Sequence, residues 1–134
     1  MLKNLFVTIL ILILLGISVF FGYNTFRSKE KYTDFEGMQR KYRVHLPKEY
    51  DKDKNYPLVF AFHGIFDNPR LFELVTGLSR KADKEGFIVV YPQGTKGRVV
   101  EPYTWNAEFC CGYASENNIN DVGFTDHLLN KMIE

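Results

Sequence analysis

Apolar and polar positions divide the chain into an uncharged leader and a mixed body. Residues 5–23 contain no charged side chain, and Lys3 is the only Lys, Arg, Asp or Glu before Arg27. At about 1.5 Å per residue, this run would extend roughly 30 Å as a helix, enough to cross the apolar core of a bilayer. We therefore expect residues 1–23 to be a signal peptide or a signal-anchor helix.

The sequence is compatible with a cleaved or an uncleaved leader, and with either orientation in the membrane. Gly16 and Ser18 are the small residues that a signal peptidase would use, but the apolar run continues beyond them. If the leader is uncleaved, residues 5–23 have the membrane as a partner. Because Lys3 precedes the run and Arg27 follows it, the positive-inside rule alone would allow a cytoplasmic body, whereas the fold argument below favours export.

Four segments of the body are expected to form strands. Residues 24–38 are expected to form a polar tether and a first edge strand, ending in a turn. Residues 39–46 alternate apolar with polar side chains, which predicts a half-buried strand with His45 facing outward. Residues 58–62 and 87–91 are continuously apolar, as expected for strands of a parallel sheet that are covered on both faces.

Helix signals alternate with these strands. Asn68 is a predicted cap for one helix that ends at Gly86, and Asp121 is a predicted cap for a final helix, which we favour over a role as an acid. Between them, residues 95–120 have little periodicity and are expected to form a long functional loop. This order predicts an α/β fold with a mostly parallel sheet and flanking helices.

The last helix pattern is still running at Glu134, and no strand follows for it to cover. Two buried strands and a leading hairpin are too few to complete a doubly wound sheet. We therefore expect residues 39–134 to be the amino-terminal part of a larger domain.

Composition narrows the function classes. The charges of the 17 basic and 16 acidic residues nearly cancel, so the chain has no large net positive charge with which to bind a phosphate backbone. We therefore expect no nucleic-acid partner. The aromatic content of 16% argues against disorder. Neither Cys-x-x-Cys nor a close histidine pair occurs, so we expect no metal and no other cofactor.

The first candidate active-site residues follow the strand predicted over residues 58–62. His63 and Gly64 follow an apolar run and precede a helix signal, which is the position of one oxyanion-hole loop in α/β-hydrolases. Glycine lets the backbone approach a substrate, and the N–H of Ile65 could point at the developing negative charge. The alternative interpretation is a plain turn with a hydrogen-bonded core histidine.

Several motifs share one order with this loop. They are Leu46-Pro47, Pro57-Leu58-Val59, His63-Gly64, Gly86–Thr95, Trp105-Asn106, Cys110-Cys111-Gly112 and Asp121-Val122-Gly123-Phe124. In this order, from about Arg40 to the end, the chain resembles the polyhydroxybutyrate depolymerase and feruloyl esterase family of secreted α/β-hydrolases. The resemblance implies a serine esterase with a Ser-Asp-His triad that acts on polyhydroxyalkanoate, feruloyl or acetyl-polysaccharide esters.

One departure concerns the nucleophile. The serines are Ser18, Ser28, Ser79 and Ser115, and none lies in the Gly-x-Ser-x-Gly elbow that such a fold uses. We therefore expect no catalytic residue in this chain, and expect the Ser, Asp and His to follow Glu134. His45, His63 and His127 are not predicted bases, and His127 is expected to be solvated.

Aromatic and cysteine residues supply the remaining candidates. Phe66, Tyr91 and Trp105 could form a wall of the acyl pocket, although Trp105 could instead anchor its loop on the sheet. A bridge between the adjacent Cys110 and Cys111 would be strained, so in an exported protein we expect their disulfide partners downstream.

Two functions follow from these observations. The first is the amino-terminal part of a secreted or membrane-anchored serine esterase, inactive by itself, with an ester substrate as its partner. The alternative is a short, non-catalytic, membrane-anchored interaction module derived from the same fold.

Overall fold

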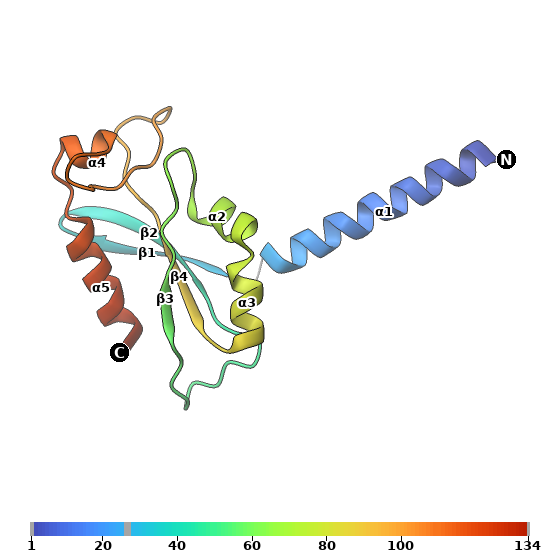
Figure 1. Ribbon diagram of the computed structural model, residues 1–134, viewed down its shortest axis with the longest axis horizontal. Helices are drawn as coiled ribbons and strands as arrows, with labels where there is room; N and C mark the ends of the chain where they lie inside the picture. Colours follow the sequence, from blue (N-terminus) through green and yellow to red (C-terminus); the bar gives the residue numbers. More distant parts are fainter. Residues whose placement is uncertain (1, 26–27, 134) are drawn as a thin grey trace.

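The computed structural model describes residues 2–25 and 28–133, and side-chain surroundings within 5–17 and 28–133. Leu2–Thr25 form α1, which extends away from the rest of the chain in Figure 1. Counting only described residues, no helix reaches the length and apolarity that a membrane span needs. The predicted signal or anchor over residues 5–23 is therefore not confirmed, and Arg27 lies outside the described residues.

The body is built on a four-stranded sheet of order β1-β2-β4-β3 (Figure 1). Its strands are β1 (Lys29–Phe35), β2 (Met38–His45), β3 (Leu58–Phe60) and β4 (Ile88–Pro92). β2 pairs antiparallel with both β1 and β4, whereas β3 pairs parallel with β4. The β1–β2 turn is made by Glu36 and Gly37, with φ of 49° and 76°, the left-handed conformation that a two-residue hairpin turn requires.

Four helices accompany the sheet. They are α2 (Pro69–Thr76), α3 (Leu78–Glu85), α4 (Gly112–Glu116) and α5 (Asp121–Ile133). Asn68 caps α2 as predicted, because its side chain accepts the N–H groups of Arg70 and Leu71. The single helix expected to end at Gly86 is divided in two, because Gly77 adopts a left-handed φ of 62° and ends α2.

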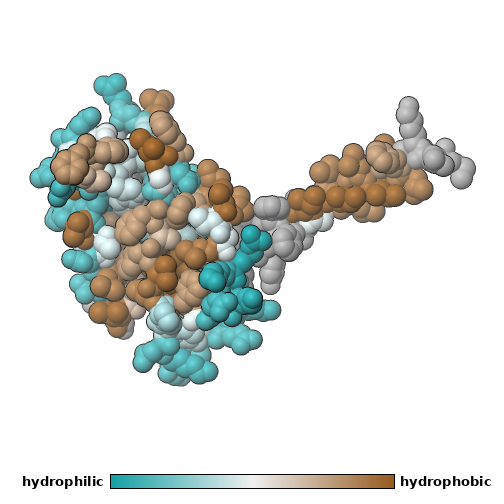
Figure 2. Space-filling view, viewed as in Figure 1, coloured by the Kyte–Doolittle hydropathy of each residue, from teal (hydrophilic) through white to brown (hydrophobic). Residues whose placement is uncertain are grey.

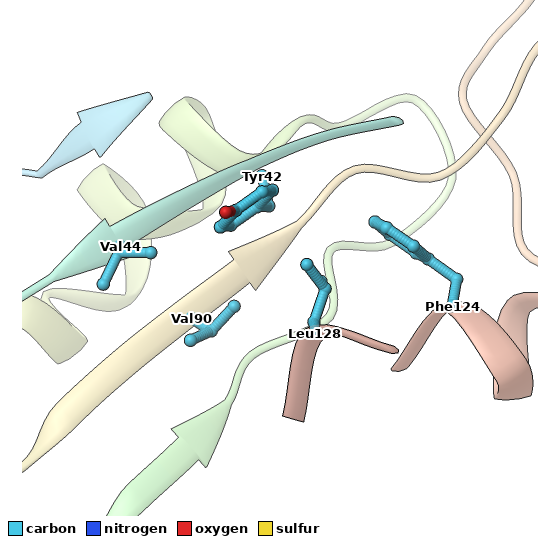
Figure 3. Close-up of a cluster of buried hydrophobic side chains, with 5 residues drawn as sticks. All are labelled: Tyr42, Val44, Val90, Phe124 and Leu128. Carbon is cyan, nitrogen blue, oxygen red and sulfur yellow. The ribbon is translucent and has the colours of Figure 1, made fainter. Parts of the chain in front are cut away.

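Each face of the sheet carries its own core. Phe124 and Leu128 of α5 point toward Tyr42, Val44 and Val90 on one face (Figure 3). On the other face, a second cluster lies beneath α2 and α3; it consists of Ala61, Ala82, Val89 and Tyr91, with Phe72, Leu78 and Phe87 packed against it. The predicted α/β class, a sheet with flanking helices, is confirmed, but the sheet is not mostly parallel as predicted, because two of its three strand pairings among the described residues are antiparallel.

β3 is an edge strand, and its three residues are only partly buried. Figure 2 shows apolar side chains gathered over the middle of the body face on which this strand lies. An apolar strand edge of this kind is a surface on which another strand or chain can pair.

Two histidines differ from their predicted settings. His45 is buried to 1% exposure rather than facing solvent, because α2 and α3 cover the face of β2 that its polar residues occupy. His127 is half-buried, and its Nε2 lies 2.9 Å from Thr33 Oγ1. The alternating pattern of β2 therefore separates an apolar buried face from a polar buried face.

Candidate active-site loop

The segment after β3 forms a tight turn into α2. The Gly64 carbonyl accepts the Asp67 N–H at 3.3 Å, and Phe66 has a φ of 63°. Phe66 is 80% exposed and Ile65 is 51% exposed, so this turn projects its side chains outward. The structure thus presents a loop between a strand end and a helix start, as the sequence predicts.

His63 is locked into this loop by both ring nitrogens. Its Nε2 accepts the Gly94 N–H at 3.1 Å, so its Nδ1 carries the proton and donates to the Gly64 carbonyl at 2.8 Å. Burial lowers the pKa of the imidazole below its ordinary value, which favours the neutral ring. A ring with both nitrogens engaged serves as a brace for the loop rather than as a proton acceptor.

Trp105 fastens the long loop to the same point. Its Nε1–H donates to the His63 carbonyl at 2.9 Å. Its ring packs edge-on against Phe62 with centroids 5.2 Å apart, and lies the same distance from the His63 ring. This is the anchoring role that the sequence offered as an alternative, whereas a contact of Trp105 or Phe66 with substrate stays a prediction.

Two glycines in this region have opposite surroundings. A Cβ added to Gly94 would lie 2.4 Å from the Thr104 carbonyl oxygen, because residues 95 and 104 exchange two backbone hydrogen bonds. A Cβ added to Gly64 would meet nothing within 4 Å. Gly94 is therefore needed for backbone packing, whereas Gly64 lies beside open space.

The backbone N–H of Ile65 makes no hydrogen bond to any described residue. An N–H beside open space and held by a braced loop is the arrangement that stabilises a developing oxyanion. The oxyanion assignment of Ile65, with His63 and Gly64 shaping the loop, stays a prediction that this geometry permits.

Tyr91 occupies a different environment from the predicted wall. It is fully buried on the α3 side of the sheet, and its hydroxyl lies 2.8 Å from Ser79 Oγ. Burial raises the pKa of its phenol to about 12. Because the side chain has no exposed surface, we withdraw Tyr91 from the candidate substrate wall.

A buried polar network was missed from the sequence. Glu73 of α2 accepts Arg43 Nε at 3.0 Å, Ser79 Oγ at 2.7 Å and the hydroxyl of Ser28. Ser28 Oγ lies 3.2 Å from His45 Nδ1. The signal was a glutamate within the otherwise apolar stripe of a helix, together with two polar residues on one face of β2.

Ser28, His45 and Asp83 form a chain of contacts that superficially resembles a catalytic triad. His45 Nε2 lies 3.0 Å from Asp83 Oδ1, but Ser28 and His45 are only 6% and 1% exposed. The hydroxyl proton of Ser28 is donated to Glu73 rather than to the imidazole. A nucleophile that no substrate can reach and no base deprotonates is not catalytic, so this group is structural.

The sulfur atoms of the adjacent Cys110 and Cys111 lie against each other. Disulfide partners downstream of Glu134 stay a prediction. The chain turns sharply here, since the Ala107 N–H donates to the Cys110 carbonyl at 2.7 Å. Within residues 5–17 and 28–133, no group of three or more His, Cys, Asp and Glu side chains could hold a metal ion.

Comparison with known proteins identifies a family. A family model described as "Esterase: Putative esterase" matches residues 35–122. No curated protein sequence matches the chain. The matched range includes the braced loop and the long loop that Trp105 anchors.

Similar solved structures include other esterases and hydrolases. A ferulic acid esterase from Anaeromyces mucronatus is 29% identical with a TM-score of 0.44, over 56% of this chain and 32% of that one. A thermostable esterase is 21% identical with a TM-score of 0.40, over 49% and 20%. A fluorophosphonate-binding serine hydrolase from Staphylococcus aureus is 16% identical with a TM-score of 0.41, over 76% and 41%. The chain therefore spans less than half the length of each of these proteins.

Proposed function

The chain belongs to the esterase family that matches residues 35–122, and from this membership we propose that it forms the oxyanion side of a serine carboxylic ester hydrolase. The single observation that carries the proposal is the unpaired Ile65 N–H on a loop braced by His63 and Trp105. An oxyanion donor is worth about 3 kcal/mol of transition-state stabilisation.

We place the missing chemistry after Glu134. None of the four serines lies in a Gly-x-Ser-x-Gly elbow, and Ser28 and Ser79 are buried in the polar network. In this proposal, a downstream serine attacks the ester carbonyl and the Ile65 N–H stabilises the tetrahedral oxyanion. Departure of the alcohol leaves an acyl-enzyme, which water then hydrolyses with help from the downstream His and Asp.

The proposed substrates are carboxylic esters of the polyhydroxyalkanoate, feruloyl or acetyl-polysaccharide type. The exposed Phe66 beside the loop suits an apolar acyl or aryl group. The proposed location is outside the cytoplasm, either secreted or anchored to a membrane, which the uncharged residues 5–23 support. Protease protection of the body in intact cells would contradict this location.

The test compares two polypeptides in hydrolysis of p-nitrophenyl acetate. The 134-residue chain is expected to give only the background rate, whereas a polypeptide extended by the codons that follow Glu134 should turn over and form an acyl-enzyme visible by mass spectrometry. Turnover by the 134-residue chain that survives both Ser79→Ala and Ser115→Ala would contradict the proposal.

The alternative function is a non-catalytic interaction module that retains the substrate-side loops. It would be supported by a reading frame that stops at Glu134. An in-frame continuation that encodes a strand and then Gly-x-Ser-x-Gly would exclude it.

A further inference from the structure

The outward surface of α2 carries apolar side chains. Leu71, Leu74 and Val75 follow helical spacing and are 44%, 38% and 75% exposed. The inner side of the same helix holds the partly buried Phe72 and the buried Glu73. A surface helix of a soluble domain normally turns its apolar stripe to the core and its charged residues to water. The apolar stripe of α2 is therefore left uncovered by the described residues.

The same two helices, α2 and α3, expose mainly basic side chains. Their exposed charged residues, all within the described part of the chain, are Arg70, Arg80, Lys81, Lys84 and Glu85. Glu73 is engaged inside the body with Arg43, and Asp83 Oδ1 lies 3.0 Å from His45 Nε2. Even with Asp83 counted as charged, the outer surface of α2 and α3 has a net charge of about +2. This charge favours an anionic partner and disfavours a second copy of the same surface.

The chain holds α2 close to the end of α1. Ser28 donates its hydroxyl proton to Glu73 of α2, and Ser28 follows Thr25, the last residue of α1, by three positions. Three residues extend at most about 11 Å. α1 also approaches α2, and Figure 1 shows α2 and α3 on the side of the body from which α1 extends. A surface that anchors α1 would therefore lie close to α2.

An apolar helix face combined with basic side chains is typical of helices that lie in the headgroup region of an anionic bilayer. The apolar side chains enter the outer acyl region, and the cations remain at the depth of the phosphates. We propose that the outward face of α2 and α3 docks onto the anionic lipid surface in which α1 is anchored. This inference rests on the proposed anchoring through residues 5–23, and it adds a second contact between the body and the bilayer.

Hydrogen–deuterium exchange of the 134-residue chain in lipid nanodiscs tests the docking. The readout is the exchange rate of the α2 amides, compared between phosphatidylcholine nanodiscs and nanodiscs with about one quarter phosphatidylglycerol. We expect exchange in α2 to be about tenfold slower with the anionic lipid, because a docked helix opens less often, and exchange in α5 to be equal in both. Each protein is compared with itself in two lipids, so a variant that is merely less stable changes both rates together.

Two pairs of variants complete the test. Val75→Glu places a charge on the apolar face and should abolish the lipid-dependent slowing. Val122→Glu is its matched control, because Val122 is also 75% exposed but lies on α5, and it should keep the slowing. Lys81→Gln should reduce the slowing about threefold. Lys52→Gln, at a lysine 81% exposed in the loop before β3, should leave it unchanged.

Equal exchange of α2 in the two lipids, or equal slowing in Val75→Glu and the unsubstituted chain, would overturn the docking and leave the anchoring in place. Failure of the chain to co-elute with nanodiscs would contradict the anchoring and the docking together. In a polypeptide extended beyond Glu134, protection of α2 that does not depend on lipid would mean that downstream residues cover this face, which would also overturn the proposal. Ester hydrolysis by that polypeptide is a separate measurement and tests the oxyanion assignment alone.

Discussion

Two arginines of β2 lie three residues apart, on opposite faces of the strand, and have opposite surroundings. Arg43 is enclosed by Glu73, the Ser28 carbonyl and Glu30 beneath α2 and α3. Arg40 is similarly buried, but it has one carboxylate partner and stacks on the Phe124 ring, with its Cζ 3.9 Å from the ring centroid. Two buried guanidinium groups of one strand are therefore stabilised in different ways: Arg43 by a hydrogen-bonded network, and Arg40 by one ion pair and ring stacking.

The largest loss of stability should come from breaking the ion pair of Arg43 and Glu73. Glu73→Gln removes the carboxylate that Arg43, Ser28 and Ser79 share, including the oxygen 3.0 Å from the buried Arg43 Nε. The free energy of unfolding should fall by about 3 kcal/mol or more, measured by urea denaturation. Glu85→Gln, at an exposed glutamate of α3, is the matched control and should change it by less than about 0.5 kcal/mol.

The equivalent change at the ion pair of Arg40 and Asp121 should lower the free energy of unfolding by less. Asp121→Asn removes the carboxylate partner of Arg40, but the Gln93 carbonyl still accepts a hydrogen bond from the guanidinium, which also stacks on the Phe124 ring. We expect a loss of about 1–2 kcal/mol in the same denaturation experiment. A loss equal to that of Glu73→Gln would mean that the two arginines are not different in kind.

Asp121 also corrects the sequence interpretation of α5. The predicted cap was Asp121, but Asn120 caps the helix, since its Oδ1 accepts the Gly123 N–H at 2.9 Å. Asp121 instead bonds Arg40 and accepts the Asn106 N–H at 2.8 Å. A residue expected to serve its own helix therefore connects that helix to β2 and to the long loop.

Alanine substitutions at Gly94 and Gly64 compare a closely packed glycine with one beside open space. Gly94→Ala would force a Cβ against the Thr104 carbonyl and should destabilise the fold by about 1–3 kcal/mol. Gly64→Ala meets no atom within 4 Å and should leave the melting temperature nearly unchanged. If both variants melted alike, Gly94 would not be the close contact that the structure describes.

The smallest change in stability should come from protonation of His63, whose two ring nitrogens hold the loop by hydrogen bonds. Because burial depresses its pKa in the folded state, the unfolded chain binds the proton more readily. The stability contribution of neutral His63 is therefore complete above the unfolded pKa of about 6.5 and is lost as the pH falls toward the folded value. Urea denaturation between pH 7.5 and pH 5.5 should show this loss, and His63→Gln should reduce it. A His63 pKa above 6.5 by NMR titration would contradict the brace.

Local patterns predicted much of the fold. Asn68 caps α2 and Gly86 ends α3 because both signals act within one turn of helix. The alternation in β2 indicated two different faces, but it could not show that α2 and α3 cover the polar one. His45 and the Glu73 network were missed for that reason, since their partners come from distant segments.

The candidate active-site loop was likewise predictable only where its residues are contiguous in the sequence. A strand end followed by His63 and Gly64 indicated the loop, because the motif is contiguous in the sequence. The bond from Gly94 to His63 joins residues 31 positions apart, and the Trp105 bond joins residues 42 positions apart. Neither contact, nor the burial of Tyr91, can be read from a pattern that extends over only a few residues.

The most direct test of the central claim is the rate of ester hydrolysis after removal of the Ile65 N–H. In a polypeptide that includes the downstream nucleophile, Ile65→Pro deletes this donor, whereas Ile65→Val keeps it and serves as the control. The account predicts a kcat about 100-fold or more lower for Ile65→Pro with a similar KM, in a variant that melts like Ile65→Val. Equal kcat values for the two folded variants would contradict the assignment of this loop to the oxyanion hole.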